Sequence, residues 1–352
     1  MTERNRLQQA GERLLPSLAY GDAAGVPVET KSYEEIADAY GALNTLIPPE
    51  NNPFFEGKWP VGTTSDDTQL SVAVARALIR AGRFDLQTHA EEHAVAYHET
   101  PKAVKPSGRR IVRGWGGSTT AALERIVLEG VSPYESGTKD GSGNGILMKM
   151  APLAYWHEAR GTSDEQRYAE YDALTTMTHD GDVARITTRV HGDVLRFLMR
   201  DDANTDELGA VAYASATRHE KTFGTTSDVT GALELLRQKM RPTPEDVQDL
   251  YAPRAEDPSK KRFGFRYSFY APETLLVAYA AFLHGRGDFH KSVFTAVNLG
   301  GDADSTASIV GGMQALTVRA NYDMPRDAEA LQDADGLREL SRALAAAALS
   351  EK

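Results

Sequence analysis

The sequence predicts an all-α protein, and two observations carry that prediction. Segments rich in Ala and Leu, with apolar residues at helical spacing, recur along the chain, whereas long alternating runs of β-branched residues are missing. The 352 residues contain no low-complexity tract, no flexible linker and no evident internal repeat. We therefore expect a single multi-helix domain over residues 1–352.

Three helices are predicted most clearly, over residues 69–82, 274–289 and 305–320. The first is Ala-rich, apolar on most sides, and followed by a glycine stop, which is typical of a helix in a large helical core. The third contains a glycine pair at 311–312, which would allow a neighbouring helix to approach closely. Residues 136–145 and 241–264 are rich in turn-forming and charged residues, so we expect loops there.

Composition excludes several classes of function. The net charge of −11 offers no basic surface for binding nucleic acid in bulk, and the absence of Cys excludes disulfides, thiolate nucleophiles and cysteine zinc sites. The first 15 residues carry charges throughout, unlike a secretory signal, and no apolar run is long enough for a membrane helix. We expect a soluble, cytoplasmic protein without a membrane partner.

An acidic pair, Asp66 and Asp67, stands between Ser65 and Thr68 at the start of the helix predicted over 69–82. One interpretation is a helix cap, because the first backbone N–H groups of a helix lack partners and the helix dipole favours negative charge there. Capping needs only one carboxylate, however, and two neighbouring carboxylates repel each other. A bound cation would offset the repulsion between the two carboxylates.

A similar group stands near the other end of the chain, where Asp302, Asp304 and Ser305 follow a glycine pair and precede a helix. Such closely spaced oxygen ligands suit Mg²⁺, Mn²⁺ or Ca²⁺, although the loop lacks the Gly and Glu of an EF-hand. If both acidic groups point into one cleft, they could hold two metal ions. Two unrelated helix caps are the alternative.

A glycine-rich stretch over residues 140–154 leads into an apolar, helical segment. Gly141, Gly143 and Gly145 can bring backbone N–H groups close to an anion. A dinucleotide-binding motif is excluded because no strand precedes the glycines. A flexible surface turn is the alternative.

Taken together, these motifs resemble the ADP-ribosylglycohydrolase family. The resemblance extends from residue 21 to about residue 316, and the acidic pair and the "GGDADS" loop are its most specific parts. In chain order, the matching segments are "GDAAGVPVE", "TTSDDTQLSVAVARAL", "GSGNGILMKMAPLA", "THDGDVAR" and "NLGGDADSTASIVGGMQAL".

The resemblance implies an all-α fold with a central cleft that holds two Mg²⁺ or Mn²⁺ ions. It also implies hydrolysis of the bond between the distal ribose of ADP-ribose and an acceptor on a protein or a small molecule. At matching positions, the resemblance implies that the metal ligands are Ser65, Asp66, Asp67, Asp302, Asp304 and Ser305. Glu29 matches an acid that lies on a mobile lid in some members. The matching contacts to ADP-ribose come from Gly143, Asn144, Gly145 and His179.

The chemistry agrees with these roles. Metal ions can orient a ribose diol and lower the pKa of a bound water, a nearby carboxylate can take a proton, and carboxylates such as Asp302 can stabilise an oxocarbenium-like state. Asp66, Asp302 and Asp304 should dominate metal retention. Glu29 and Asp67 are both candidates for the proton acceptor, and the sequence does not choose between them.

Two departures from the family pattern concern the metal ligands and the acceptor. Both metal-site hydroxyls belong to Ser, where many members have Thr, so that the methyl group that restricts the Thr rotamer is missing. Where many bacterial relatives have an acid, this chain has Arg109, Arg110 and Arg113. These arginines could meet a phosphate or an acidic acceptor, or they could form a solvated basic face. The acceptor could therefore differ from arginine.

Aromatic residues at 265, 267, 269 and 270 offer faces on which adenine could stack, and Tyr270 is our candidate. Core packing is the more frequent use of such residues. Two further motifs are interpreted as chance matches: "HAEEH" at 89–93, which resembles a zinc peptidase motif, and the His179–Asp180 pair, which resembles that of metal phosphohydrolases.

The main alternative is a non-catalytic member of the same family, either an ADP-ribose-binding protein or a crystallin-like structural protein. The hydrolase is favoured because every carboxylate expected in the two metal groups is present. The sequence leaves open the acceptor, the choice between Mg²⁺ and Mn²⁺, and the oligomeric state, and a monomer is compatible with it.

Overall fold

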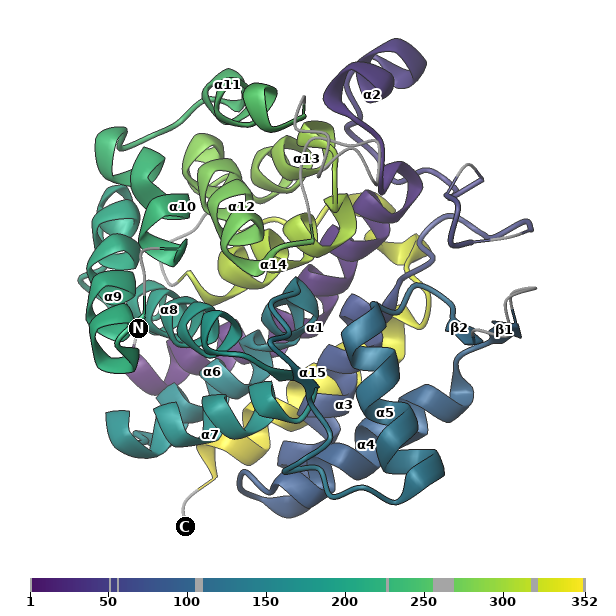
Figure 1. Ribbon diagram of the computed structural model, residues 1–352. Helices are drawn as coiled ribbons and strands as arrows, with labels where there is room; N and C mark the ends of the chain where they lie inside the picture. The colour runs from purple at the N-terminus through teal and green to yellow at the C-terminus, as the bar shows by residue number, and fades with distance from the viewer. Residues whose placement is uncertain are drawn as a thin grey trace.

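Helix α1 (Glu3–Gly25) runs diagonally through the middle of the molecule, and α14 (Ala303–Leu316) lies against it (Figure 1). The computed structural model describes residues 2–50, 52–55, 57–104, 110–225, 228–255, 269–317 and 322–350. Within them, the fold is almost entirely helical, which confirms the predicted class.

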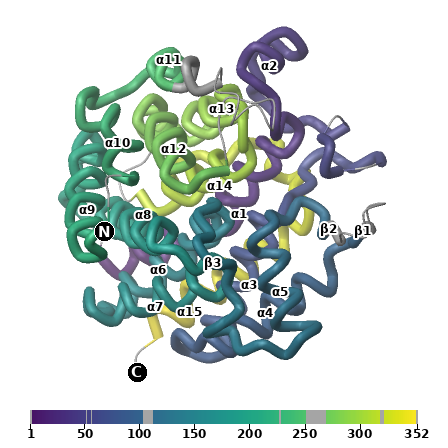
Figure 2. The backbone as a smooth tube through the Cα atoms, in the orientation of Figure 1, coloured from purple at the N-terminus to yellow at the C-terminus, as the bar shows by residue number. Residues whose placement is uncertain are grey.

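Thirteen further α-helices surround this central pair in the described residues. In the backbone view, α9 and α10 form one side of the molecule, and α4 and α5 form the opposite side (Figure 2). The helices are α2 (Tyr33–Tyr40), α3 (Asp66–Ala81), α4 (Leu86–Glu99), α5 (Gly117–Glu129), α6 (Ala151–Arg160), α7 (Asp164–Thr176), α8 (Asp182–Leu198), α9 (Leu208–Phe223), α10 (Asp228–Gln238), α11 (Pro244–Ala255), α12 (Ala271–Gly285), α13 (Phe289–Leu299) and α15 (Ala334–Leu349).

Short elements complete the described chain. The strands β1 (Lys102–Val104) and β2 (Arg110–Val112) pair antiparallel, whereas β3 (Thr138–Lys139) and β4 (His179–Asp180) pair in parallel. The 3₁₀ helices are η1 (Val26–Val28), η2 (Asn144–Lys149), η3 (Thr205–Glu207) and η5 (Arg326–Ala330). The β3–β4 pair sets His179 beside the glycine-rich stretch.

The contact between α1 and α14 depends on glycines, because it brings the two backbones together. A Cβ atom on Gly21 would lie 2.0 Å from the carbonyl oxygen of Ala307, and one on Gly25 would lie 2.3 Å from that of Ala303. From the other side, a Cβ atom on Gly311 would lie 2.2 Å from the carbonyl oxygen of Ser17. The close approach predicted at the glycine pair is therefore confirmed at Gly311, and α1 is the neighbour.

One hydrophobic cluster extends from Leu7 to Ala348 and joins α1 to the last helix. The two ends of the described chain also meet, because the Arg4 guanidinium donates a hydrogen bond of 3.0 Å to the carbonyl oxygen of Leu349. Among the described residues, no helix combines the length and apolar character that a bilayer-spanning segment needs.

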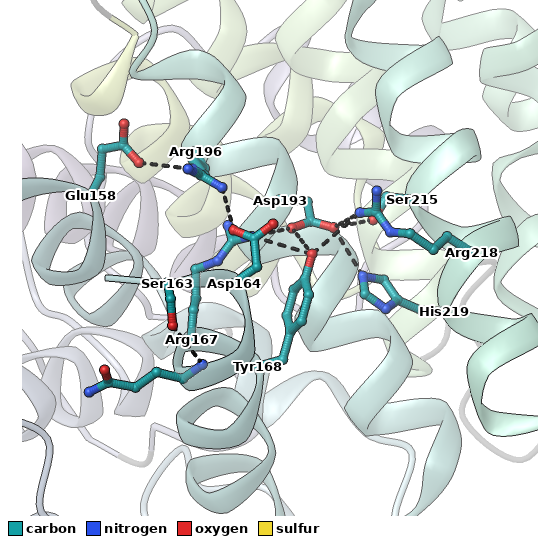
Figure 3. A network of polar contacts seen from close by, with 11 residues as sticks. Glu158, Ser163, Asp164, Arg167, Tyr168, Asp193, Arg196, Ser215, Arg218 and His219 are labelled. Carbon is teal, nitrogen blue, oxygen red and sulfur yellow. Dashed lines mark hydrogen bonds and ion pairs between the residues drawn. The ribbon is translucent and has the colours of Figure 1, made fainter. Parts of the chain in front are cut away.

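Helices α7, α8 and α9 are tied together by a polar network around Asp193 (Figure 3). The Asp193 carboxylate accepts hydrogen bonds from Tyr168 at 2.9 Å and Ser215 at 2.6 Å, and it contacts His219 at 3.0 Å. It also forms ion pairs with Arg167 at 3.1 Å and Arg218 at 2.5 Å. Burial opposes the charged form, but these partners outweigh it and lower the pKa of Asp193 to about 2.

The loop predicted over 241–264 was wrong for its first half, because residues 244–255 form α11. Thr243 and Asp246 exchange hydrogen bonds at the start of this helix, as in a capping box, and Pro244 occupies its first position. These N-terminal signals outweigh the charge and proline content on which the loop prediction was based. Residues 256–264 lie outside the described part of the chain.

Candidate active site

Two buried groups of three carboxylates share Asp304. Oxygen atoms of Asp22, Asp67 and Asp304 lie within 4.8 Å of one another, and so do oxygen atoms of Glu29, Asp302 and Asp304. These side chains come from α1, the turn after it, the start of α3 and the start of α14. The two acidic groups predicted from the sequence are thus brought together, with Asp304 common to both triads.

Ser65, rather than either Asp, forms the cap of α3. Its hydroxyl oxygen accepts a hydrogen bond of 3.2 Å from the backbone N–H of Asp67, and its φ and ψ are extended. Asp66 and Asp67 are the first two residues of the helix, and both are buried. The acidic pair is therefore not needed to cap the helix.

Asp22 anchors this turn from α1. Its carboxylate accepts hydrogen bonds of 3.0 Å from the backbone N–H groups of Ser65 and Thr68, and one of 2.5 Å from the Thr68 hydroxyl. Sequence reasoning missed Asp22 as a site residue. The available signal was an Asp between two glycines of the "GDAAG" segment, in a helix that is otherwise apolar around it.

Asp67 links the two halves of the site. Its Oδ2 atom accepts hydrogen bonds from the Ser65 hydroxyl at 3.0 Å and the Ser305 hydroxyl at 3.3 Å. Its Oδ1 atom, like Oδ1 of Asp304, is buried and has no hydrogen-bond partner among the described residues. Buried carboxylate oxygens without donors are what a hard divalent cation requires, so the residues present fit a metal site.

The pKa values of the clustered acids also fit a metal site. Burial, followed by the charge of Asp304, raises the pKa of Asp22 to about 7. The same two causes, in the same order, raise the pKa values of Glu29, Asp66 and Asp67 well above their usual range. Without a cation, these carboxylates cannot all ionise near neutral pH.

Glu29 follows directly after η1 and is held by a neighbouring loop. The Asn52 side-chain amide donates hydrogen bonds to Oε2 of Glu29 at 2.9 Å and to the Val26 carbonyl oxygen at 2.6 Å. Both Glu29 and Asn52 are buried. Glu29, which matches an acid on a mobile lid in some members of the family, is therefore held in place as part of the second triad in this conformation.

The glycine-rich stretch reaches the cluster through Asn144. The Asn144 amide donates hydrogen bonds to Asp302 and, at 3.0 Å, to Thr274 of α12. A Cβ atom on Gly145 would lie 3.3 Å from Cε1 of His179, and one on Gly143 would lie 3.4 Å from its Nε2. The structure thus brings Asn144, Gly145, Gly143 and His179 together.

Tyr270 is held next to this stretch through its backbone. Gly143 and Tyr270 form an isolated antiparallel bridge, with hydrogen bonds from Asn144 N to Phe269 O at 3.0 Å and from Ala271 N to Ser142 O at 2.9 Å. Residues 265 and 267, two of the four aromatic candidates, lie outside the described chain.

Lys149, at the end of η2, is a second residue that sequence reasoning missed. Its side chain is fully buried, and its ammonium has no hydrogen-bond partner among the described residues. Burial lowers the pKa of Lys149 to about 7, and the nearby Asp66 carboxylate opposes this shift. The apolar run around it gave no signal that this lysine lies close to the acidic cluster.

The two histidines of the "HAEEH" motif lie in α4. His89 and His93 are both buried, and neither belongs to a group of three metal-ligating side chains among the described residues. Of the arginines predicted to affect the acceptor, Arg109 lies outside the described residues, and only the backbone of Arg110 is described. Arg113 is fully described and lies in the turn after β2.

Comparison with known proteins identifies the family. The family model for ADP-ribosylglycohydrolase matches residues 6–352, so the chain belongs to the ADP-ribosylglycohydrolase family. It is 28% identical over 331 residues to an uncharacterized protein of Archaeoglobus fulgidus, covering 93% of each chain. It is 25% identical over 299 residues to the ADP-ribosylarginine hydrolase Tri1 of Serratia proteamaculans, covering 84% of this chain and 68% of that protein.

A solved structure described as an ADP-ribosylglycohydrolase-related protein complex has the same fold. It superposes with a TM-score of 0.68 at 24% identity and covers 98% of this chain and 99% of its own. At that identity, the similarity supports the fold and not the details of the site.

Proposed function

We propose that this protein is a hydrolase that releases ADP-ribose from an ADP-ribosylated acceptor and depends on two divalent cations, Mg²⁺ or Mn²⁺. The observation that carries this proposal is the pair of buried carboxylate triads that share Asp304. The family supports an ADP-ribosyl substrate, and Tri1, a relative, is named as a hydrolase of ADP-ribosylarginine.

Asp22, Asp67 and Asp304 would hold one cation, and Glu29, Asp302 and Asp304 the other. Ser65 and Ser305 add hydroxyl oxygens beside Asp67. Asp66 belongs to neither triad. Bound cations would supply Lewis-acid polarisation of the ribose and of the attacking water.

Glu29 is our candidate for the proton acceptor. Each triad contains one of the two candidates for the proton acceptor, Asp67 in the first and Glu29 in the second. Asp67, however, already accepts hydrogen bonds from two serine hydroxyls through Oδ2. Glu29 is held instead by the neutral Asn52 amide, which orients the carboxylate and adds no proton or charge. Taking the proton of an attacking water is a role that such an oriented carboxylate can perform.

The glycine-rich stretch is proposed to bind ADP-ribose. Gly143 and Gly145 have no side chains, so a diphosphate can approach the backbone there, and Asn144 connects this stretch to Asp302. Burial, followed by the Lys149 charge, lowers the pKa of His179 to about 3, so that its imidazole is neutral at physiological pH. Tyr270, next to Gly143, is the candidate for stacking on adenine.

A calorimetric titration of ADP-ribose tests the site before the acceptor is known. We expect binding with Mg²⁺ or Mn²⁺, loss of binding in excess EDTA, and loss of binding in Asp302→Ala. Chromatography of ADP-ribose released from ADP-ribosylated protein then separates a hydrolase from a non-catalytic reader. Metal-dependent binding without any release by the wild-type protein would support the reader, and no binding under any condition would contradict the proposed site.

A further inference from the structure

A cavity of about 410 Å³ opens beside the acidic cluster. Thr64 and Thr68, on either side of the cap of α3, are among its lining residues, and the Thr68 hydroxyl also donates a hydrogen bond to Asp22 of the first triad. The remaining walls come from α3, α4, the turn after β2 and the start of α15, and they include Trp59, Arg76, Glu99 and Arg113.

Arg113 is placed in this cavity by stacking. Its guanidinium carbon lies 4.2 Å from the centroid of the Trp59 ring and 5.1 Å from that of Phe55, and its backbone N–H donates to the Pro101 carbonyl oxygen at 3.1 Å. Stacking of this kind fixes the plane of a guanidinium. The side chain is therefore pre-organised and does not swing freely.

Among the described residues, the guanidinium forms no ion pair, although the Asp22 charge opposes the lowering of the Arg113 pKa by burial. Its Nε and Nη1 atoms are buried and have no hydrogen-bond partner among the described residues. Three acids line the cavity, Glu92, Glu99 and Asp333, and among the described residues none of them forms an ion pair with Arg113. Glu92 instead pairs with Arg80 at 3.0 Å. Buried N–H groups without acceptors are costly, so this arginine is poised for an anionic ligand.

Arg113 lies close to the acidic cluster. The next residue is Gly114, and a Cβ atom there would lie 3.6 Å from Cβ of Ser65 and 3.8 Å from Oδ1 of Asp66. Phe55, which stacks on the guanidinium, follows Asn52, the residue that holds Glu29. Arg113 thus lies near the start of α3, which carries Asp66, and against the segment whose Asn52 holds Glu29.

We propose that Arg113 and its cavity receive an anionic group, a carboxylate or a phosphate, of the acceptor from which ADP-ribose is released. This inference rests on the proposed function. An arginine acceptor would instead bring a second guanidinium next to Arg113, and like charges repel at this distance. The chain would then differ in acceptor from a relative that acts on ADP-ribosylarginine.

The test compares two ligands that differ at the acceptor position, ADP-ribose and ADP-ribose 1″-phosphate. Calorimetric titrations with Mg²⁺ present give the ratio of the two dissociation constants, so that effects common to both ligands cancel. A hydrogen-bonded ion pair with Arg113 should favour the phosphate by about tenfold or more in the wild-type protein. In Arg113→Gln the ratio should fall close to one, and in Arg113→Lys it should be intermediate.

Arg83→Gln is the matched control, because it removes one positive charge from an exposed site between α3 and α4. It should keep the wild-type ratio, and thermal unfolding should show that all three variants are folded. A preference for the phosphate that survives in Arg113→Gln, or its absence in the wild-type protein, would overturn the inference alone. Failure of ADP-ribose itself to bind would overturn the proposed function and the inference with it.

A second titration distinguishes the sources of the anion. Two peptides that carry ADP-ribose on serine, with Glu or Gln as the neighbouring residue, are compared in the same way. Tighter binding of the Glu peptide, lost in Arg113→Gln, would indicate an acidic protein segment. Equal binding of the two peptides, with the phosphate preference intact, would indicate a phosphorylated acceptor.

Discussion

The Ser305 hydroxyl, at the start of α14, donates a hydrogen bond of 3.3 Å to the Asp67 carboxylate at the start of α3, across 238 positions of the chain. This contact joins the two acidic groups, because Ser305 is next to Asp304 in α14 and Asp67 is next to Asp66 in α3. Asp304, next to Ser305, then belongs to both carboxylate triads.

Asp304→Asn should impair both cation sites at once, since Asp304 is the carboxylate that the triads share. We expect Mn²⁺ affinity to fall by at least about a hundredfold, in line with the loss of a principal carboxylate ligand, when it is measured by calorimetry. Asp335→Asn, which changes an exposed acid of α15, is the control and should bind as the wild type does. Two cations still bound by Asp304→Asn would contradict a shared ligand.

Glu29→Gln and Asp67→Asn should separate proton transfer from metal binding. We expect Glu29→Gln to slow the release of ADP-ribose in single turnovers by about a hundredfold or more, which is the usual contribution of a general base. Because both residues belong to triads, both substitutions should weaken Mn²⁺ binding, so turnover is compared at saturating Mn²⁺, where Asp67→Asn should keep most of its rate. If Asp67→Asn keeps its cations but loses turnover, then the proton acceptor is Asp67 and not Glu29.

Gly25→Ala should force α1 and α14 apart. Its Cβ atom would lie 2.3 Å from both the Ala303 carbonyl oxygen and the backbone nitrogen of Asp304, and backbone atoms cannot move aside locally. We expect a loss of about 2 to 3 kcal/mol in the free energy of unfolding, as for overpacked cores, together with weaker cation binding.

Gly231→Ala in α10 provides the matched control for Gly25→Ala. It faces open space within a helix, so it should stabilise the protein by about 0.5 to 1 kcal/mol. Denaturant unfolding gives both values. Equal effects of the two substitutions would show that close contact between α1 and α14 is not required.

The stabilising effect of cations should grow as the pH rises. The folded-state pKa of Asp22 is raised from 3.8 to about 7, so the metal-free native state binds more protons than the unfolded chain between these values. Its stability is therefore lost as the pH rises through about 7, and bound cations should offset that loss. Melting temperatures in EDTA and in Mn²⁺ should diverge between pH 5 and pH 8, and a constant difference would argue against the linkage.

Asp193→Asn should destabilise the protein without affecting the active site, since it breaks the network that joins α7, α8 and α9 (Figure 3). We expect a loss of about 3 kcal/mol, because Arg167 remains buried after its partner is removed. Asp202→Asn, at an exposed ion pair with Arg200, should cost at most about 1 kcal/mol and serves as the control.

The same network gives a pH dependence. The pKa of Asp193 is lowered from 3.8 to about 2, so its stabilising effect is fully present above pH 3.8 and is lost as the pH falls toward 2. Denaturant unfolding of the wild-type protein and of Asp193→Asn should therefore give free energies that converge over this interval. A difference that stays constant down to pH 2 would contradict the lowered pKa.

The sequence alone determined the fold class and most of the acids of the site. Helical spacing and glycine stops identify α3, α12 and α14, because these signals are local to each segment. The acidic pair at Asp66 and the "GGDADS" loop also stand out locally, since adjacent carboxylates without cationic neighbours are unfavourable unless a ligand is bound. The α11 prediction failed for the opposite reason, because prolines and charges masked a helix start.

Only the tertiary structure decided which acids lie together in the two triads. Asp22 and Asp304 are far apart in the chain, and they meet because glycines let α1 and α14 touch along their backbones. Tertiary packing also sets the properties of two basic residues. Burial lowers the pKa of Lys149 near Asp66, and the Trp59 ring holds the guanidinium of Arg113. Burial and close packing, which no local pattern encodes, convert ordinary charged residues into a site.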